Sequence, residues 1–145
     1  MIYLAGPIHQ KEDWLQNKYL IELLREWGFD VWSPQEAGIA CDIAKETGRE
    51  LKDVRKEFCK KDLEGMKQCA VCLAYLGRER EPSQGMLWEM GWFAALERPV
   101  IFYNPCDNPI TLMAEFTSKI VKTEEELLEC LRDWSSYSWL ESSIC

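Results

Sequence analysis

The sequence predicts an α/β fold in which about five mostly parallel strands carry helices on both faces. Short apolar runs that end at Gly or Pro alternate along the chain with longer segments whose apolar residues recur at helical spacing. This alternation is typical of a parallel sheet with crossover helices. At 145 residues, of which 47% are hydrophobic, the chain can bury one core, and no second folded domain is expected.

The first half of the chain is expected to begin with a strand at residues 2–5, which Gly6-Pro7 closes. Helical spacing then predicts a helix over 14–27. The remaining elements of this half are a second strand at 29–32, stopped by Ser33-Pro34, and a helix at 51–66. The intervening residues 35–50 contain two glycines, and we expect an irregular, partly mobile excursion there whose length suggests a lid.

The second half continues the alternation. Its expected elements are a strand at 69–76, a helix at 84–96, a strand at 99–103, a helical turn at 110–116, an edge strand at 119–122 and a helix at 123–134. Residues 123–126, Thr-Glu-Glu-Glu, predict a capping box at the start of the last helix. The sheet is therefore predicted to be doubly wound, of the flavodoxin-like or Rossmann-like type. Residues 1–134 form the domain, and the apolar tail 135–145 is expected to dock on its own sheet or on a neighbouring subunit.

Charge and cysteine content exclude several classes of function. The formal charge of -8 leaves no basic field for a DNA or RNA polymer, although a local site could still bind one mononucleotide. Cys69 and Cys72 are the only close pair of cysteines, and on one strand they would face opposite sides. With His9 as the only imidazole, a zinc site is not expected. Free thiols, no signal peptide and no long apolar run predict a soluble cytoplasmic protein away from membranes.

A ligand site is expected at the carboxyl ends of the strands, as in other open parallel sheets. Three loops lie there, at residues 5–9, 77–84 and 104–113. In the second loop Ser83 occupies a helix N-cap position, and Gly85 would let a ligand approach the N–H groups of the first turn. Ser83 is therefore a candidate for phosphate binding, with an ordinary capping serine as the alternative.

Glu89 and Asp62 are the candidate catalytic carboxylates. Glu89 is the only charge in a helix that is apolar nearly all round, where a carboxylate is costly unless it has a task; a solvated helix charge is the alternative. Asp62 lies four residues from both Phe58 and Met66, on the apolar stripe of its helix or at its margin. Two carboxylates in one crevice suit glycosidic chemistry, in which one attacks the anomeric carbon and the other handles the proton of the leaving group.

Four segments match, in order, the motifs of one family. Residues 2–7, Ile-Tyr-Leu-Ala-Gly-Pro, resemble its opening strand, and 61–66, Lys-Asp-Leu-Glu-Gly-Met, resemble its Asn-Asp-Leu-x-x-Ile helix. Residues 85–91, Gly-Met-Leu-Trp-Glu-Met-Gly, are similar to its Gly-Thr-x-x-Glu-Leu-Gly helix, and 109–113, Pro-Ile-Thr-Leu-Met, to its Pro-Ile-Asn-Leu-Met. Each motif is weak alone, but together they make the chain, from residue 2 to about residue 131, resemble the nucleoside 2-deoxyribosyltransferases.

The resemblance implies a retaining mechanism on a small-molecule deoxynucleoside or deoxynucleotide. It makes Glu89 the nucleophile that forms a covalent deoxyribosyl-enzyme, with Tyr3 hydrogen-bonded to orient it and Asp62 protonating or deprotonating the base nitrogen. No cofactor or metal is required. Thr111 and Met113 match positions that family members contribute across a subunit interface, which implies a homodimer or larger homo-oligomer with shared active sites. The residues expected to bind substrate are Gly6, Ile8, His9, Ser83, Gly85, Thr111 and Met113.

Two departures from the family pattern bear on the substrate. Ser83 stands where many transferases have an aspartate at the sugar 5′-hydroxyl, and Thr111 where they have an asparagine. An aspartate beside a 5′-phosphate would cost about 1–4 kcal/mol of like-charge repulsion, so its absence admits the phosphate. Residues 82–85, Pro-Ser-Gln-Gly, also resemble the Pro-Ser-x-Gly of the 2′-deoxynucleoside 5′-monophosphate N-glycosidases. The glycine-arginine phosphate contact of that branch is here 8–10, Ile-His-Gln, so its cation would have to come from His9, Arg78 or Arg80.

The sequence thus predicts a nucleotide N-hydrolase of deoxyribonucleotide metabolism or base salvage, which releases the deoxyribosyl group from Glu89 to water. One alternative is a transferase that exchanges bases between unphosphorylated deoxynucleosides. A nucleotide-binding module without turnover is the other. Trp32, Trp88 and Trp92 are candidates to stack on the base, although tryptophans of this kind are more often part of the core.

Overall fold

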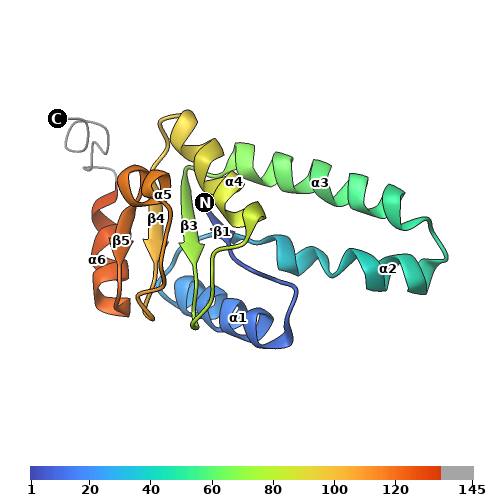
Figure 1. The fold of residues 1–145 in the computed structure, drawn as a ribbon, viewed down its shortest axis with the longest axis horizontal. Helices are drawn as coiled ribbons and strands as arrows, with labels where there is room; N and C mark the ends of the chain where they lie inside the picture. Colours follow the sequence, from blue (N-terminus) through green and yellow to red (C-terminus); the bar gives the residue numbers. More distant parts are fainter. Residues whose placement is uncertain (135–145) are drawn as a thin grey trace.

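A computed structural model describes residues 1–134, and its centre is a sheet of five parallel strands in the order β2-β1-β3-β4-β5 (Figure 1). The strands are β1 (Ile2–Ala5), β2 (Val31–Trp32), β3 (Val71–Tyr75), β4 (Val100–Tyr103) and β5 (Lys119–Val121). The order reverses direction between β1 and β3, which makes the sheet doubly wound. The predicted fold class is confirmed, and the predicted edge strand is β5.

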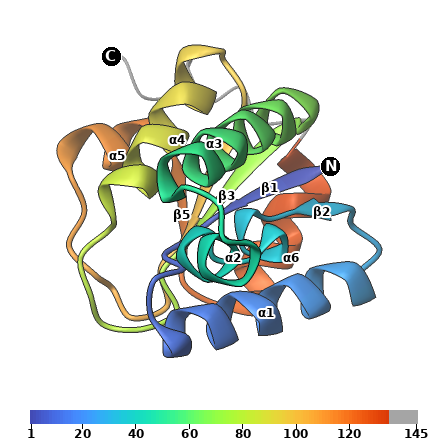
Figure 2. The same ribbon diagram turned by 90° about the vertical axis from the view of Figure 1, so that its right-hand side faces the viewer.

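Helices cover both faces of the sheet (Figure 2). On one face, α1 (Lys11–Glu26) and α6 (Glu124–Asp133) pack on a core that includes Leu4 and Leu73. On the other face, α3 (Leu51–Gln68), α4 (Gln84–Ala95) and α5 (Leu112–Thr117) pack on a core that includes Tyr3 and Cys72. Because side chains alternate along a strand, neighbouring residues of β1 and of β3 belong to different cores.

The helices α2 (Ala40–Thr47) and α3 project together beyond the sheet as an arm (Figure 1). The expectation of an irregular excursion at residues 35–50 is wrong, because this stretch contains the short helix η1 (Pro34–Ala37) as well as α2. Its two glycines end these helices: Gly38 and Gly48 have φ of 93° and 65°, values that favour glycine. Ala44 is only 8% exposed, so packing contributes to α2, which at eight residues is too short to be stable alone.

Two local predictions are also corrected. Cys69 lies beyond the strand, as the C-cap of α3, and it shares one core with Cys72, so the two thiols do not face opposite sides of the sheet.

Thr123 does cap α6, since its side chain accepts from the Glu126 N–H at 3.1 Å. The Glu126 carboxylate, however, accepts from the N–H of Lys122 instead of returning to Thr123, so the capping box is not reciprocal.

Within residues 1–134 no helix combines the length and the apolar character that crossing a membrane requires. The described cysteines are free thiols: Cys41, Cys59, Cys69, Cys72, Cys106 and Cys130. The tail at 135–145, for which docking is expected, lies outside the described residues.

Candidate active site

A cavity of about 560 Å³ between α3 and α4 contains both candidate carboxylates, Asp62 and Glu89. Its lining is largely apolar. Besides the two acids, it consists of Ala40, Arg55, Phe58, Cys59, Leu63, Met66, Gly85, Trp88 and Trp92. Asp62 comes from the arm helix α3 and Glu89 from α4, so the tertiary fold brings together two acids that are 27 positions apart in the sequence.

Tyr3 holds Glu89 by a hydrogen bond. The side chain of Tyr3, fully buried on β1, donates from its hydroxyl to Oε1 of Glu89 at 2.7 Å. Burial, followed by the charge of Glu89, raises the pKa of Tyr3 well above its usual value, so Tyr3 remains a donor. Burial also raises the pKa of Glu89 to about 7, against the opposing effect of the Tyr3 hydrogen bond. Tyr3 therefore orients Glu89 and favours its ionised form.

Asp62 is half-buried, and burial raises the pKa of its carboxyl to about 6. The negative charge of Asp62 in turn raises the pKa values of both Tyr3 and Glu89, so the two acids titrate as a coupled pair. Between these two pKa values the pair holds about one proton. That proton resides more on Glu89, whose pKa is the higher, and the hydrogen bond from Tyr3 reduces this preference.

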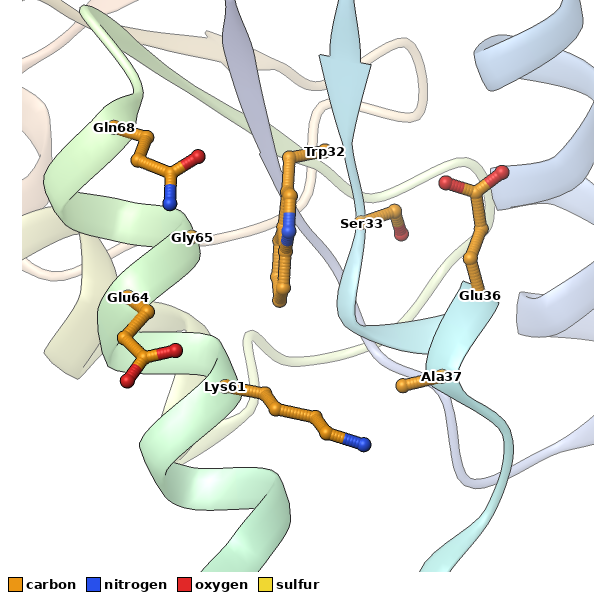
Figure 3. Close-up of a pocket in the computed structure, with 8 residues that line it drawn as sticks. All are labelled: Trp32, Ser33, Glu36, Ala37, Lys61, Glu64, Gly65 and Gln68. Carbon is orange, nitrogen blue, oxygen red and sulfur yellow. The ribbon is translucent and has the colours of Figure 1, made fainter.

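Trp32 packs against the ring of Tyr3. Their rings are stacked with centroids 5.3 Å apart and an interplanar angle of 10°. On its other side the indole faces Gly65 of α3, where an added Cβ would lie 2.4 Å from Cε2 of Trp32 (Figure 3). The indole lines a separate cavity of about 290 Å³ on the η1 side of α3 and is absent from the lining of the carboxylate cavity. Trp32 packs against the core and is placed to position Tyr3, in line with the core role that the sequence favoured over stacking on a base.

Aromatic rings form the walls of the carboxylate cavity on either side. Trp88 and Trp92 come from α4, and Phe58 comes from α3. Trp88 is 58% exposed, an unusual state for so large an apolar side chain unless something covers it. These rings are suited to stack on the faces of a nucleobase.

Sequence reasoning missed three polar or small residues of this wall, Arg55, Cys59 and Ala40. Ala40 belongs to α2, and that helix was not predicted. Arg55 and Cys59 carried a usable signal, since they lie seven and three residues before Asp62 and therefore on its face of the helix.

Ser83 lies at the N-terminus of α4, as predicted, and its Oγ accepts from the N–H of Met86 at 3.2 Å. The hydroxyl hydrogen of Ser83 remains available to a ligand. Two residues further, Gly85 lines the carboxylate cavity, and a Cβ added to it would meet nothing within 4 Å. The approach to the first turn of α4 is therefore open.

Two arginines lie in the loop before Ser83. Both Arg78 and Arg80 form ion pairs with Asp13, which is 3% exposed, and the Arg78 Nε to Oδ1 distance is 2.7 Å. Arg78 also donates to Gln10, in the loop that follows β1. Asp13 thus ties the loop after β3 to α1, Arg78 ties it to the loop after β1, and the guanidinium groups lie at the carboxyl edge of the sheet.

The loop after β1 is held by contacts within the protein. Gly6 is needed for a close approach, because an added Cβ would lie 2.8 Å from Oδ1 of Asn17. Asn17 donates to the carbonyl of Pro7 at 2.8 Å. Ile8 is half-buried and His9 is exposed, and neither lines the cavity with the two acids.

Thr111 and Met113 lie apart from the carboxylate cavity. Together they line a groove of about 380 Å³ between α4 and α5. Thr111 caps α5 by accepting from the N–H of Ala114 at 3.3 Å. Met113 is 70% exposed. Within one chain, these two predicted substrate-binding residues are not brought together with Asp62 and Glu89.

The described residues contain no group of three or more His, Cys, Asp or Glu that could hold a metal ion. What the cavity offers is a half-buried carboxylate held by a hydrogen bond, a second acid of raised pKa and aromatic surfaces. This combination suits displacement at an anomeric carbon with a nitrogen base as leaving group.

Comparison with known proteins points in the same direction. Residues 2–126 match the family model described as nucleoside 2-deoxyribosyltransferase. The chain is similar to the structure of a 2-deoxyribosyltransferase from Bacillus psychrosaccharolyticus, with 24% identity, a TM-score of 0.72 and coverage of 88% of this chain and 89% of that one.

Two further solved structures share the fold at lower similarity. For a CMP N-glycosidase from Clostridium botulinum the identity is 19% and the TM-score 0.55, over 90% of this chain and 97% of that one. For a 2-desoxiribosyltransferase from Leishmania mexicana the identity is 19% and the TM-score 0.52, over 83% and 73% respectively. No curated protein matches the chain.

Proposed function

The chain belongs to the nucleoside 2-deoxyribosyltransferase family, and on this premise we propose that it hydrolyses the N-glycosidic bond of 2′-deoxynucleoside 5′-monophosphates. The observation that carries the proposal is the 2.7 Å hydrogen bond from Tyr3 to Glu89, with Asp62 in the same cavity. The cavity therefore supplies an oriented carboxylate for the sugar and a second acid for the base.

In the first step an ionised oxygen of Glu89 bonds to C1′ as the bond from C1′ to the base nitrogen breaks. The electron pair of that bond moves to the base, which takes a proton from Asp62. In the second step the Asp62 carboxylate accepts a proton from water, whose oxygen bonds to C1′ and releases Glu89. The products are the free base and deoxyribose 5-phosphate, and both acids return to their starting state.

The number of protons on the free site suits this order of events. Attack needs an anionic Glu89 and departure of the base needs a protonated Asp62, which together amount to one proton on the pair. The raised pKa values, about 7 for Glu89 and about 6 for Asp62, leave one proton on the pair between these two pH values. The hydrogen bond from Tyr3 lowers the pKa of Glu89 and so increases the share of the form with the charge on Glu89.

The 5′-phosphate is assigned to the N-terminus of α4. Ser83 retains a hydroxyl hydrogen for a phosphate oxygen, and the first turn beyond it is open at Gly85. The cation comes from Arg78 or Arg80 in the adjoining loop. Each is paired with Asp13, but a guanidinium group has five N–H donors and keeps some for a second anion.

A second candidate function is base exchange between unphosphorylated deoxynucleosides. It is favoured by the structural comparison, in which the TM-score with a transferase, 0.72, exceeds the 0.55 for an N-glycosidase. In this case Ser83 and Thr111 would hydrogen-bond the 5′-hydroxyl, and a second base would capture the Glu89 intermediate.

Substrate comparison tests the proposal. Release of base from deoxynucleotides and from deoxynucleosides is measured by chromatography, with and without an added acceptor base. We expect faster release from the phosphorylated substrates and no dependence on acceptor. Faster turnover of the unphosphorylated donor, rising with acceptor, would identify a transferase instead.

We further propose a homo-oligomer whose active sites are shared between subunits. Leu112, Met113 and Phe116 form an exposed apolar patch on α5, with exposed fractions of 69%, 70% and 56%, next to the groove that contains Thr111. Thr111 and Met113 do not line the carboxylate cavity of their own chain, so a contact with substrate requires a second copy. Sedimentation analysis tests this, and a monomer at assay concentrations would contradict it.

A further inference from the structure

Arg55 is the only basic residue that lines the carboxylate cavity. It is exposed, and no ion pair or hydrogen bond engages it within residues 1–134. Lys61 of the same helix differs, since it pairs with Glu57, which also binds Arg49 before the helix begins. An uncommitted guanidinium in a cavity with two acids has no partner of its own and is available to a ligand.

Helix geometry places Arg55 on the same face as the acid of α3. It lies seven residues before Asp62, close to two full turns, with Phe58 and Cys59 between them on the same face. The separation along the axis is about 10 Å, a distance that an arginine side chain and a nucleobase span together. Arg55 therefore lies at the outer end of the cavity, beyond the acid assigned to the base nitrogen.

This end of the cavity is the base side and not the phosphate side. Figure 1 shows the beginning of α3 far out on the arm, whereas α4 begins beside the sheet. Ser83, to which the phosphate is assigned, caps that beginning of α4. The rings of Phe58, Trp88 and Trp92 lie on the lining with Arg55 and offer faces for a base. A base stacked there would present its far edge to Arg55.

The N–H donors of Arg55 determine which kind of base edge it can bind. A guanidinium group only donates hydrogen bonds, so it pairs with a carbonyl oxygen and not with an amino group. The oxygen at position 6 of hypoxanthine or guanine, or at position 4 of uracil or thymine, accepts such bonds. An amino group at the same position, as in adenine or cytosine, is itself a donor and leaves the guanidinium unpaired.

We propose that Arg55 is a specificity-determining residue that selects oxo bases over the corresponding amino bases at the far edge of the base pocket. The assignment rests on the proposed function of the cavity, and it names the substrate class: 2′-deoxynucleotides of 6-oxopurines or 4-oxopyrimidines. Arg55 contributes to selectivity and takes no part in the bond changes at C1′.

The test compares pairs of substrates that differ only at this edge. Values of kcat/KM are measured for the monophosphates of deoxyinosine and deoxyadenosine, and of deoxyuridine and deoxycytidine, and for the four unphosphorylated deoxynucleosides. We expect the wild type to favour the oxo member of at least one pair by roughly ten- to a hundredfold. Arg55→Met should lower that preference by at least tenfold, through loss on the oxo member. Lys56→Met, the same charge change at the next exposed position, should leave the preference unchanged.

Dissociation constants separate this inference from the proposed function. They are measured by calorimetry for the same nucleotides with Glu89→Ala and with the double variant Glu89→Ala/Arg55→Met. If the wild type releases no base but the oxo preference in binding depends on Arg55, the proposed hydrolysis is wrong and the specificity role stands. An oxo preference that Arg55→Met leaves unchanged overturns the role, and so does a wild type without such a preference. A loss confined to phosphorylated substrates, equal for oxo and amino bases, assigns Arg55 to the phosphate and also overturns it.

Discussion

The helices α4 and α3 each present one of the two acids, in very different surroundings. In α4 Glu89 is the only charged residue, and the helix packs on the sheet through Met86, Met90 and Phe93. In α3 ten of eighteen residues are charged, and much of its length lies in the arm, away from the sheet. One acid is thus fixed by the core and the other is carried by a largely solvated helix.

This difference separates two tasks. A nucleophile must be held within a fraction of an ångström of its target, and α4 with β1 provides that rigidity through the bond from Tyr3 to Glu89. Recognition of a variable base needs exchangeable side chains, and α3 offers them on one face, from Arg55 to Asp62. Changes on α4 should therefore affect turnover, and changes on the outer part of α3 should affect selectivity.

The largest effect is expected for Glu89→Ala. Removing the attacking carboxylate should lower kcat by at least about four orders of magnitude, as for other covalent nucleophiles, because no intermediate can form. Rates of base release and thermal unfolding would be measured together. Glu125→Ala, an exposed acid on α6, is the control and should retain full activity. Unchanged base release by a folded Glu89→Ala protein would show that this residue is not the nucleophile.

Tyr3→Phe should lower activity by roughly ten- to a hundredfold, because it removes a hydrogen bond to a charged group. The effect should depend on pH. The bond stabilises ionised Glu89, whose pKa is about 7, so its loss raises that pKa further and moves the acid limb of the kcat profile to higher pH. The loss is therefore greater at pH 6 than at pH 8.

The matched control is Tyr103→Phe, a buried tyrosine in the core on the other face of the sheet. Its pH profile should follow that of the wild type. An acid limb that Tyr3→Phe leaves in place, or moves to lower pH, would contradict the role given to Tyr3.

Gly65→Ala tests whether α3 affects Glu89 indirectly, through the contacts of Trp32 with Tyr3. The new methyl would lie 2.4 Å from Cε2 of Trp32, and the indole cannot retreat freely because it stacks on Tyr3. We expect the free energy of unfolding to fall by about 1–3 kcal/mol, with kcat reduced severalfold. Gly91→Ala is the control, since a Cβ there meets nothing within 4 Å. Denaturant unfolding and kcat would both be measured. Equal behaviour of the two variants would refute the idea that the contact between Gly65 and Trp32 holds Tyr3 in place.

Ser83→Asp should have the narrowest effect, confined to the choice of substrate. Aspartate still caps α4, but its charge repels a phosphate, so the ratio of kcat/KM for nucleotide over nucleoside should fall about tenfold, or 1.4 kcal/mol. Ser83→Asn, a neutral residue that also caps helices, should leave the ratio nearly unchanged. Equal ratios in all three proteins would argue against phosphate recognition at this position.

The sequence predicted the sheet and the long helices because their signals are local. Apolar runs predicted the first four strands within two residues, and the lone charge of Glu89 in an apolar helix singled out this residue. The helix α2 was missed because eight residues between two glycines give only a weak local signal for a helix, and such a short helix depends on packing. Cys69 was misplaced for a related reason, since the end of an apolar run does not mark the end of a strand.

What the sequence determined by itself is therefore the fold class, the order of its elements and a short set of candidate residues. The tertiary structure decided which of these meet. It placed Tyr3 against Glu89 and Trp32 behind Tyr3, brought Arg55 into the cavity, and left Thr111 and Met113 outside it. The physical reason is that periodicity reports which face of an element is apolar, whereas contacts between elements distant in sequence depend on how the faces pack.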